Sequence, residues 1–184
     1  MRRLVIFVIE TKSDKENSDG VYLRETIEHL YEYDRSNTIV KFVFMNGKGN
    51  YNKSSVVNKI DSYIKDSKKI DKDTACSVLY VFDKDNNDTS RDDENFNRSV
   101  VDFCNRNGYL LIWMNKNIEE AYWKQEVNHK QKVTMAGKFK KTNEITKVDV
   151  ATLSVPEANR RYTSNVLLEL DKVLDRKNNE PIQN

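Results

Sequence analysis

Two aspartates separated by one lysine, Asp83 and Asp85, end an apolar stretch in the segment SVLYVFDKDNND, residues 77–88. Residues two apart on a strand point to the same side, so both carboxylates would face one site if the strand continues. Glu10 follows another apolar run, LVIFVI, residues 4–9. Three converging carboxylates repel one another, and a hard divalent cation such as Mg²⁺, which prefers oxygen ligands, relieves that repulsion.

The same segment has a second interpretation. Asp, Asn and Ser favour turns, so DKDNNDTSRDDEN, residues 83–95, could form a solvated loop before a helix. The stretch alone leaves the two interpretations even, and Glu10 at the matching position favours the metal site. Asp88 is then the candidate for a further ligand, whereas Asp14, Asp92 and Asp93 are expected in solvent.

These acids must be positioned by alternating strands and helices. Hydrophobic patterns predict strands within 4–9, 37–47, 77–88 and 109–115, and helices within 21–33, 54–70, 95–108 and 164–176. This order predicts an α/β fold with a central, Rossmann-like parallel sheet of about four strands and helices on both faces. Sites in such sheets form at the carboxyl ends of the strands, where Glu10 and Asp83 fall.

The expected chain organisation is one α/β domain over residues 1–125, followed by residues 126–184, which pack on the same domain. The second part contains an irregular, lysine-rich segment and the C-terminal helix. The basic and apolar start, MRRLVIFVIE, is too short for a signal peptide or a membrane span and favours a buried strand. We therefore expect a cytoplasmic protein without a membrane partner. Cys76 and Cys104 are expected as buried thiols.

Charge is balanced overall but uneven along the chain. The net charge of +2 gives no global basic field, yet residues 83–94 carry a local −4 and residues 116–147 a local +4. An acidic metal site beside a lysine-rich arm suits phosphodiester chemistry, with Lys138, Lys140 and Lys141 as candidate contacts to nucleic acid. An exposed arm without a partner has the same composition. Trp113 is expected in the core, and Tyr122 or Trp123 could stack on a base.

The turn NGKGN, residues 46–50, follows the second predicted strand. Its glycines could let backbone amides and Lys48 approach a phosphate, although an ordinary strand-to-helix turn uses the same residues. It does not have the P-loop pattern, and the chain contains no Walker motif. Any ATP-driven step would therefore require a separate ATPase partner.

In combination, these motifs resemble the Toprim fold of topoisomerases, primases and OLD-type nucleases, and within it the RloB-like proteins. The matching pieces are VIETKSD, NGKGN, VFDKDNND and MNKNIEEAYW, which together span roughly residues 3–125. Thr11 stands where these families have a glycine after the glutamate. Glu119 is the counterpart of the acid in their FExW motif, with Glu120 as the competing register.

The resemblance implies a Mg²⁺- or Mn²⁺-dependent nuclease that acts on DNA or RNA, in bacterial defence or a mobile element. Glu10 would be a general acid/base or metal ligand, and Asp83 and Asp85 would bind the metal. Glu119 would complete the site, or would only favour the dipole of the helix it starts.

Two other functions fit the same sequence. One is a non-catalytic Toprim-like module that binds nucleic acid or protein. The other is a haloacid-dehalogenase-type phosphatase, because VLYVFDKDNNDT imitates its Asp-x-Asp motif. That family places the motif on its first strand, whereas here two strand–helix units precede Asp83, so this function ranks third.

Overall fold

The fold is described from a computed structural model of the chain, which places residues 2–13, 17–84 and 91–177. A parallel four-stranded sheet has the strand order β2-β1-β3-β4. The strands are β1 (Arg3–Ile9), β2 (Thr38–Phe44), β3 (Ala75–Lys84) and β4 (Leu110–Asn115). The predicted α/β class and parallel sheet are confirmed.

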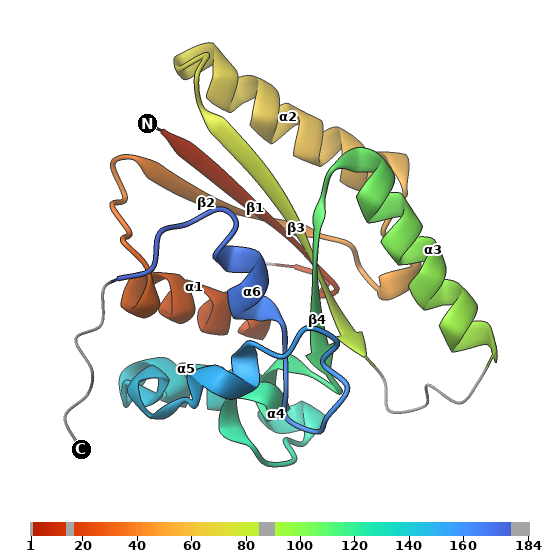
Figure 1. The fold of residues 1–184 in the computed structure, drawn as a ribbon, viewed down its shortest axis with the longest axis vertical. Helices are drawn as coiled ribbons and strands as arrows, with labels where there is room; N and C mark the ends of the chain where they lie inside the picture. The colour runs from red at the N-terminus through yellow and green to blue at the C-terminus, as the bar shows by residue number, and fades with distance from the viewer. Residues whose placement is uncertain (1, 14–16, 85–90, 178–184) are drawn as a thin grey trace.

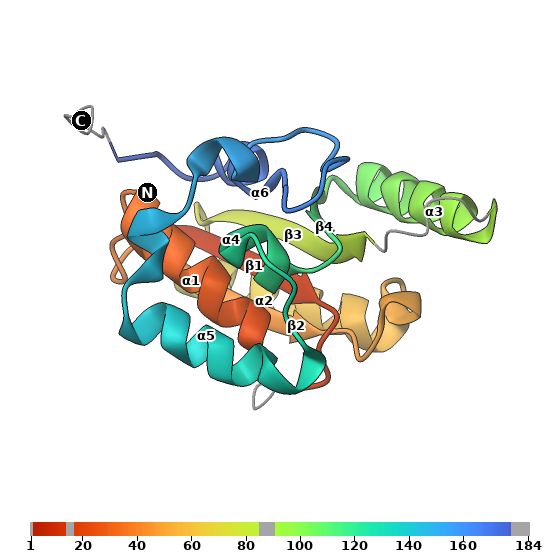
Figure 2. The same ribbon diagram turned by 90° about the horizontal axis from the view of Figure 1, so that it is seen from below.

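Helices cover both faces of the sheet (Figure 1), because side chains on each strand alternate between two buried clusters. One face packs against α2 (Ser54–Ile70) and α3 (Arg91–Asn107), and the other packs against the remaining helices. These are α1 (Ser18–Leu30), α4 (Ile118–Trp123), α5 (Lys132–Lys141) and α6 (Val166–Leu170). Figure 2 shows the same layers from below.

Central strand β1 is apolar on both sides, and its residues Leu4 to Ile9 are at most 2% exposed. Such a continuous apolar run is typical of a parallel strand covered on both faces. β1 pairs with β2 and β3 in register, so that Ile9 lies beside Phe44 and Val8 beside Tyr80. This register brings the carboxyl ends of the three strands together.

Helix α1 begins where the Asn17 side chain accepts a 2.7 Å hydrogen bond from the N–H of Gly20. A side chain at Gly20 would collide with that cap, because a Cβ there would lie 2.3–2.6 Å from atoms of the Asn17 side chain. The cap therefore fixes the first turn of α1, which carries Ser18 and Asp19.

The segment after residue 125 belongs to the same core as the sheet. Phe139 on α5 contacts the rings of Tyr22 and Tyr122, and Leu153 and Leu167 are fully buried in the same cluster. The lysine-rich stretch is more regular than the sequence suggested, because it contains α5. Short 3-10 helices complete the chain: η2 (Lys48–Asn50), η3 (His129–Gln131), η4 (Glu144–Lys147) and η5 (Val150–Leu153).

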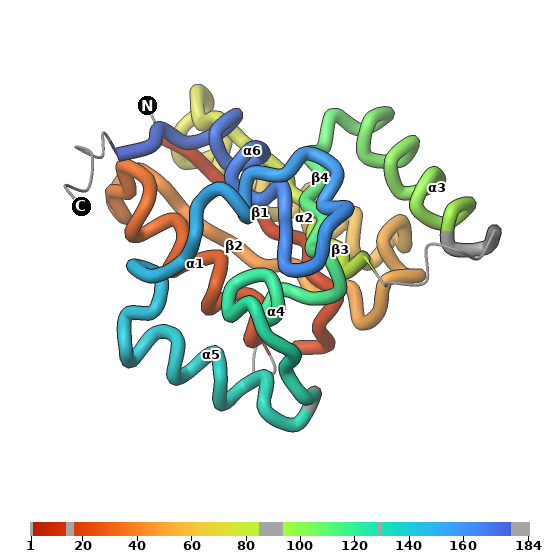
Figure 3. The backbone as a smooth tube through the Cα atoms, turned by 60° about the horizontal axis from the view of Figure 1, so that its bottom comes forward, coloured from red at the N-terminus to blue at the C-terminus, as the bar shows by residue number. Residues whose placement is uncertain are grey.

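The C-terminal segment lies beside two distant parts of the chain (Figure 3). Helix α6 ends at Leu170, earlier than the predicted helix over 164–176. The chain then turns and pairs with the end of α1, where Tyr31 and Arg176 form an antiparallel bridge. Upstream of α6, Ser164 bridges Met114 of β4, and the Asn165 side chain bonds to the N–H of Trp113 and the carbonyl of Leu111.

No helix within the described ranges is both long and apolar enough to cross a membrane.

Candidate functional site

Glu10 and Asp83 meet at the carboxyl edge of the sheet. Glu10 is the first residue after β1, and Asp83 is near the end of the neighbouring strand β3. The N–H of Asp83 donates a 3.1 Å hydrogen bond to Oε1 of Glu10. The sequence-based prediction that these two acids share an edge of the sheet is therefore correct.

The turn after β2 holds Glu10 in place. The N–H of Gly47 donates a 2.9 Å hydrogen bond to the carbonyl of Glu10, and the N–H of Asn46 donates to the carbonyl of Thr11 at 3.2 Å. Both turn residues have positive φ, 56° at Asn46 and 102° at Gly47, which explains the Asn-Gly pair. The amide of Gly47 is thus used within the protein, and the turn orients the acid.

Thr11 is not among the described residues with positive φ, so its φ angle is one that a residue with a side chain adopts readily. Its Oγ1 is buried and has no hydrogen-bond partner in the described part of the chain.

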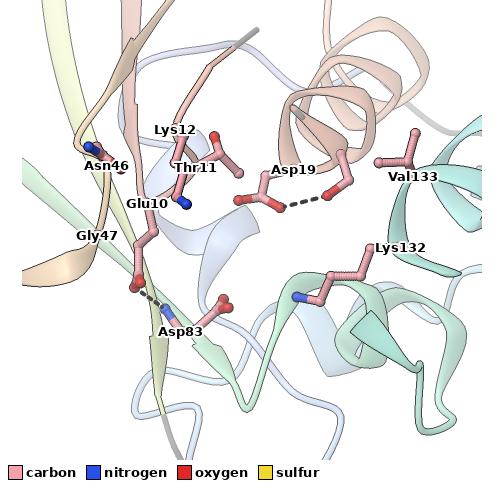
Figure 4. Close-up of a pocket in the computed structure, with 10 residues that line it drawn as sticks. Glu10, Thr11, Lys12, Asp19, Asn46, Gly47, Asp83, Lys132 and Val133 are labelled. Carbon is pink, nitrogen blue, oxygen red and sulfur yellow. Dashed lines mark hydrogen bonds between the residues drawn. The ribbon is translucent and has the colours of Figure 1, made fainter. Parts of the chain in front are cut away.

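A cavity of about 390 Å³ opens at this edge (Figure 4). Five charged residues line it: Glu10 and the exposed Lys12 after β1, Asp19 on α1, Asp83 on β3 and Lys132 on α5. Figure 4 shows the Lys132 side chain extending from α5 toward Asp83. We call this cavity the acidic pocket.

Asp19 is a further acid of the pocket. Its Oδ1 accepts a 3.2 Å hydrogen bond from the Ser18 hydroxyl. Burial and the nearby Glu119 carboxylate raise the pKa of Asp19 to about 7. An aspartate with this pKa exchanges a proton near neutral pH.

The pKa of Asp83 is also raised, well above its ordinary value. Its main cause is desolvation among the surrounding groups, followed by repulsion from the carboxylates of Asp19 and Glu10. Lys132 acts in the opposite direction. The carboxyl groups of the acidic pocket therefore disfavour one another's ionisation, so a cation bound there would stabilise their charged forms; Asp83 itself keeps partial contact with solvent.

Lys132 is held by a fully buried carboxylate. Its Nζ lies 3.0 Å from Oε2 of Glu119, whose side chain is 0% exposed, while the lysine side chain is 23% exposed. The other oxygen of Glu119 accepts a 3.0 Å hydrogen bond from the Ser18 hydroxyl. Burial opposes the charge on Lys132, yet the carboxylates of Glu119 and Asp83 raise its pKa. Ser18, Glu119 and Lys132 thus form one network across α1, α4 and α5.

This network distinguishes Glu119 from Glu120. Glu119 contacts Ser18 and Lys132 behind the acidic pocket, without lining it. Glu120 points elsewhere, to Lys116 at 3.1 Å and to the Asn117 side chain. Of these two candidate acids, Glu119 is therefore the one next to the pocket, where it pairs with Lys132.

The other predicted site residues are distributed as follows. Asp85 and Asp88 lie outside the described residues. Lys48 on η2 lies over the Phe96 ring, Lys138 lies over the Trp123 ring, and Lys140 pairs with Glu25 at 3.5 Å. Lys141 is exposed at the end of α5. None of these four lysines, all of which are described, lines the acidic pocket.

Sequence reasoning missed Asp19 and the special place of Lys132. Asp19 lies in a polar run after the first strand, and only the Asn17 cap, followed by Gly20, signals that a helix presents it. Lys132 was one of eight lysines in the arm, with nothing local to separate it from the others.

Within the described ranges, no three His, Cys, Asp or Glu side chains are grouped closely enough to hold one metal ion. Comparisons with protein-family models, curated proteins and solved structures found no match for this chain. The function must therefore be argued from the acidic pocket itself.

Proposed function

We propose that this protein is a Mg²⁺-dependent phosphodiesterase that acts on nucleic acid. The observation that carries the proposal is the meeting of Glu10 and Asp83 at the ends of adjacent parallel strands, in a pocket that also contains Asp19 and Lys132. Clustered carboxyl groups beside the partly buried ammonium of Lys132 suit a bound cation and a phosphate.

The donor set fits Mg²⁺. Glu10 and Asp83 offer hard oxygen ligands, and Mg²⁺ typically uses one or two carboxylates and keeps several waters. Thr11 also lines the pocket, and its buried hydroxyl has no hydrogen-bond partner among the described residues. When bound, the ion would polarise a phosphoryl oxygen and lower the pKa of a coordinated water.

Three side chains would have separate roles around the phosphate. Glu10 and Asp83 would hold the ion. Lys132, fixed by Glu119, would place its ammonium against a non-bridging phosphate oxygen. Asp19, with a pKa of about 7, would take a proton from the attacking water or give one to the leaving oxygen.

A binding module that does not cut nucleic acid is the second candidate. It is favoured by the Lys132–Glu119 ion pair, because the buried ammonium already has a fully buried counter-charge. A substrate would compete with Glu119 for that ammonium.

Hydrolysis assays separate the candidates. Bis(p-nitrophenyl) phosphate, plasmid DNA and an RNA would each be incubated with the protein in Mg²⁺, Mn²⁺ or EDTA. We expect metal-dependent cleavage of the diesters, reduced at least about 100-fold by Asp83→Asn and by Glu10→Gln. Asp102→Asn, an exposed acid on α3, is the matched control and should keep full activity.

Unchanged activity of Asp83→Asn would reject the proposed site. Binding of nucleic acid without turnover in any metal would favour the binding module. Turnover of p-nitrophenyl phosphate without cleavage of any diester would favour a phosphatase.

A further inference from the structure

A second cavity, of about 470 Å³, adjoins the acidic pocket. It lies between the end of β2 and the first turns of α2, and Asn46 lines both cavities. The Asn50 side chain fixes this shared corner by donating hydrogen bonds to the carbonyls of Met45 and Asn46, at 3.0 and 2.6 Å. The two cavities therefore meet at Asn46, in the turn after β2.

Strand β2 leaves this side of the sheet open. It is the edge strand of the order β2-β1-β3-β4, and no described segment pairs with its outer edge. Figure 1 shows β2 at the margin of the sheet, and helix α2 contacts both β2 and β1.

The second cavity is basic. Lys53 and Lys59 line it and are exposed, and Lys41 on β2 lies next to it, 5.7 Å from the Tyr63 ring centroid. Among the described residues that line it, none is Asp or Glu. Asp61 on α2 is not one of its lining residues.

Aromatic side chains accompany these lysines. Tyr63 is partly exposed in the cavity, with Lys59 Nζ 4.7 Å from its ring centroid, and Phe44 is partly exposed at the end of β2. Lysines interleaved with accessible rings are typical of surfaces that bind single-stranded nucleic acid, where lysines contact phosphates and rings stack on bases.

We propose that this cavity, the β2 groove (Phe44, Asn46, Asn50, Lys53, Lys59 and Tyr63), binds a single strand of nucleic acid and leads it into the acidic pocket. The inference rests on the proposed function for the identity of the ligand. Lys53 and Lys59 contact successive phosphates, and Tyr63 or Phe44 supports a base. The occupant is a polyanion because the groove offers lysines and, among the described residues that line it, no carboxylate.

The first test measures binding without catalysis. Fluorescence anisotropy of labelled dT12 and rU12 is recorded in EDTA at several salt concentrations. For Lys53→Ala/Lys59→Ala we expect binding at least about tenfold weaker, with the slope of log K against log salt reduced by about 1.4 for two lost phosphate contacts. Tyr63→Leu should weaken binding without changing that slope.

Two double variants serve as controls. Lys68→Ala/Lys72→Ala removes the same charge at the exposed far end of α2 and should leave affinity nearly unchanged. Lys138→Ala/Lys141→Ala tests the competing surface on α5. The inference is overturned if the α5 variant loses binding and the groove variant does not. It is also overturned if the groove variant binds normally and the edge of β2 instead pairs two copies in sedimentation.

The second test separates the groove from the active site. Bis(p-nitrophenyl) phosphate carries a single phosphate and has no neighbouring phosphates for Lys53 and Lys59 to contact, so Lys53→Ala/Lys59→Ala should hydrolyse it at the wild-type rate while cleaving oligonucleotides poorly. If the groove variant cleaves oligonucleotides as fast as the wild type does, as it hydrolyses the small diester, the inference is overturned and the proposed function remains intact. Absence of any hydrolysis, with groove-dependent binding of dT12, would reject the enzyme but retain the groove.

Discussion

The backbone N–H of Asp83 donates to Oε1 of Glu10, so a side chain continues the contact between β1 and β3 beyond their last paired residues, Val8 and Tyr80. The hydrogen bond holds one oxygen of Glu10 against β3 and places the carboxylate beside that of Asp83. Because the donor is a backbone group, substitution of the Asp83 side chain leaves this bond in place.

Asp83 can therefore be tested without losing the position of Glu10. Mg²⁺ should raise the free energy of unfolding, by about 2.7 kcal/mol at a Mg²⁺ concentration 100 times its Kd, as measured by thermal unfolding. Asp83→Asn should reduce or abolish this gain, whereas Asp102→Asn should retain it. An equal Mg²⁺ response in both variants would place the ion elsewhere.

The pKa of Asp19 predicts how stability depends on pH. In the unfolded chain this carboxyl titrates near 3.9, whereas in the folded protein its pKa is about 7. The folded state thus binds the proton more tightly, and its stability falls as pH rises from about 4 to about 7, then levels off.

Asp19→Asn should remove this loss. In urea unfolding without metal at pH 8, we expect the variant to be about 1–3 kcal/mol more stable, after discounting the full pKa difference for partial solvent exposure. The gain should shrink toward pH 4. Asp66→Asn, whose exposed carboxylate pairs with Lys69 and has a lowered pKa, should show no gain. A gain at Asp19 that is independent of pH would contradict the assignment.

The Glu119–Lys132 pair should contribute strongly to stability. Glu119→Ala leaves a mostly buried ammonium without its nearest counter-charge and removes one of the two acceptors of the Ser18 hydroxyl, so we expect a loss of about 2–4 kcal/mol. Glu119→Gln retains an acceptor for Ser18 and should lose less. Asp66→Ala breaks the exposed pair with Lys69 and serves as the control, with no measurable effect. Equal effects of Asp66→Ala and Glu119→Ala would show that the network does not stabilise the fold.

Asn165 should contribute more to the stability of the fold than its position in a loop indicates. Its buried side chain accepts from the N–H of Trp113 at 2.7 Å and donates to the carbonyl of Leu111 at 3.0 Å. Asn165→Ala leaves both backbone groups of β4 unpaired, for an expected loss of about 1–3 kcal/mol in urea unfolding. Asn159→Ala, which loses only an exposed contact to Glu157, should be neutral. A neutral result at Asn165 would mean that water replaces its side chain at the strand.

The sequence predicted those features that local pattern determines. Continuous apolar runs such as Leu4 to Ile9 identify buried parallel strands, and parallel strands bring their carboxyl ends, with Glu10 and Asp83, to one edge. Gly108, which closes α3 with a φ of 67°, was likewise readable as a helix end.

Features that depend on packing between distant segments could not be predicted from the sequence. Lys132 differs from its neighbouring lysines only because α5 packs against α1, which brings its ammonium to Glu119. Helix α6 ends early because the chain beyond Leu170 pairs with the end of α1, a contact between residues 30–32 and 175–177. Such long-range pairing overrides the helical spacing of Val166, Leu170, Val173 and Leu174.

The two margins of the sheet differ in a way that bears on self-association. Ser164 and Asn165 occupy the backbone groups along β4, so the protein's own chain closes that margin, while no described segment closes the margin at β2. A sheet that can grow in only one direction joins at most two copies by strand addition, and growth then stops. Extended filaments built edge to edge are therefore disfavoured for this fold, whichever ligand occupies the β2 groove.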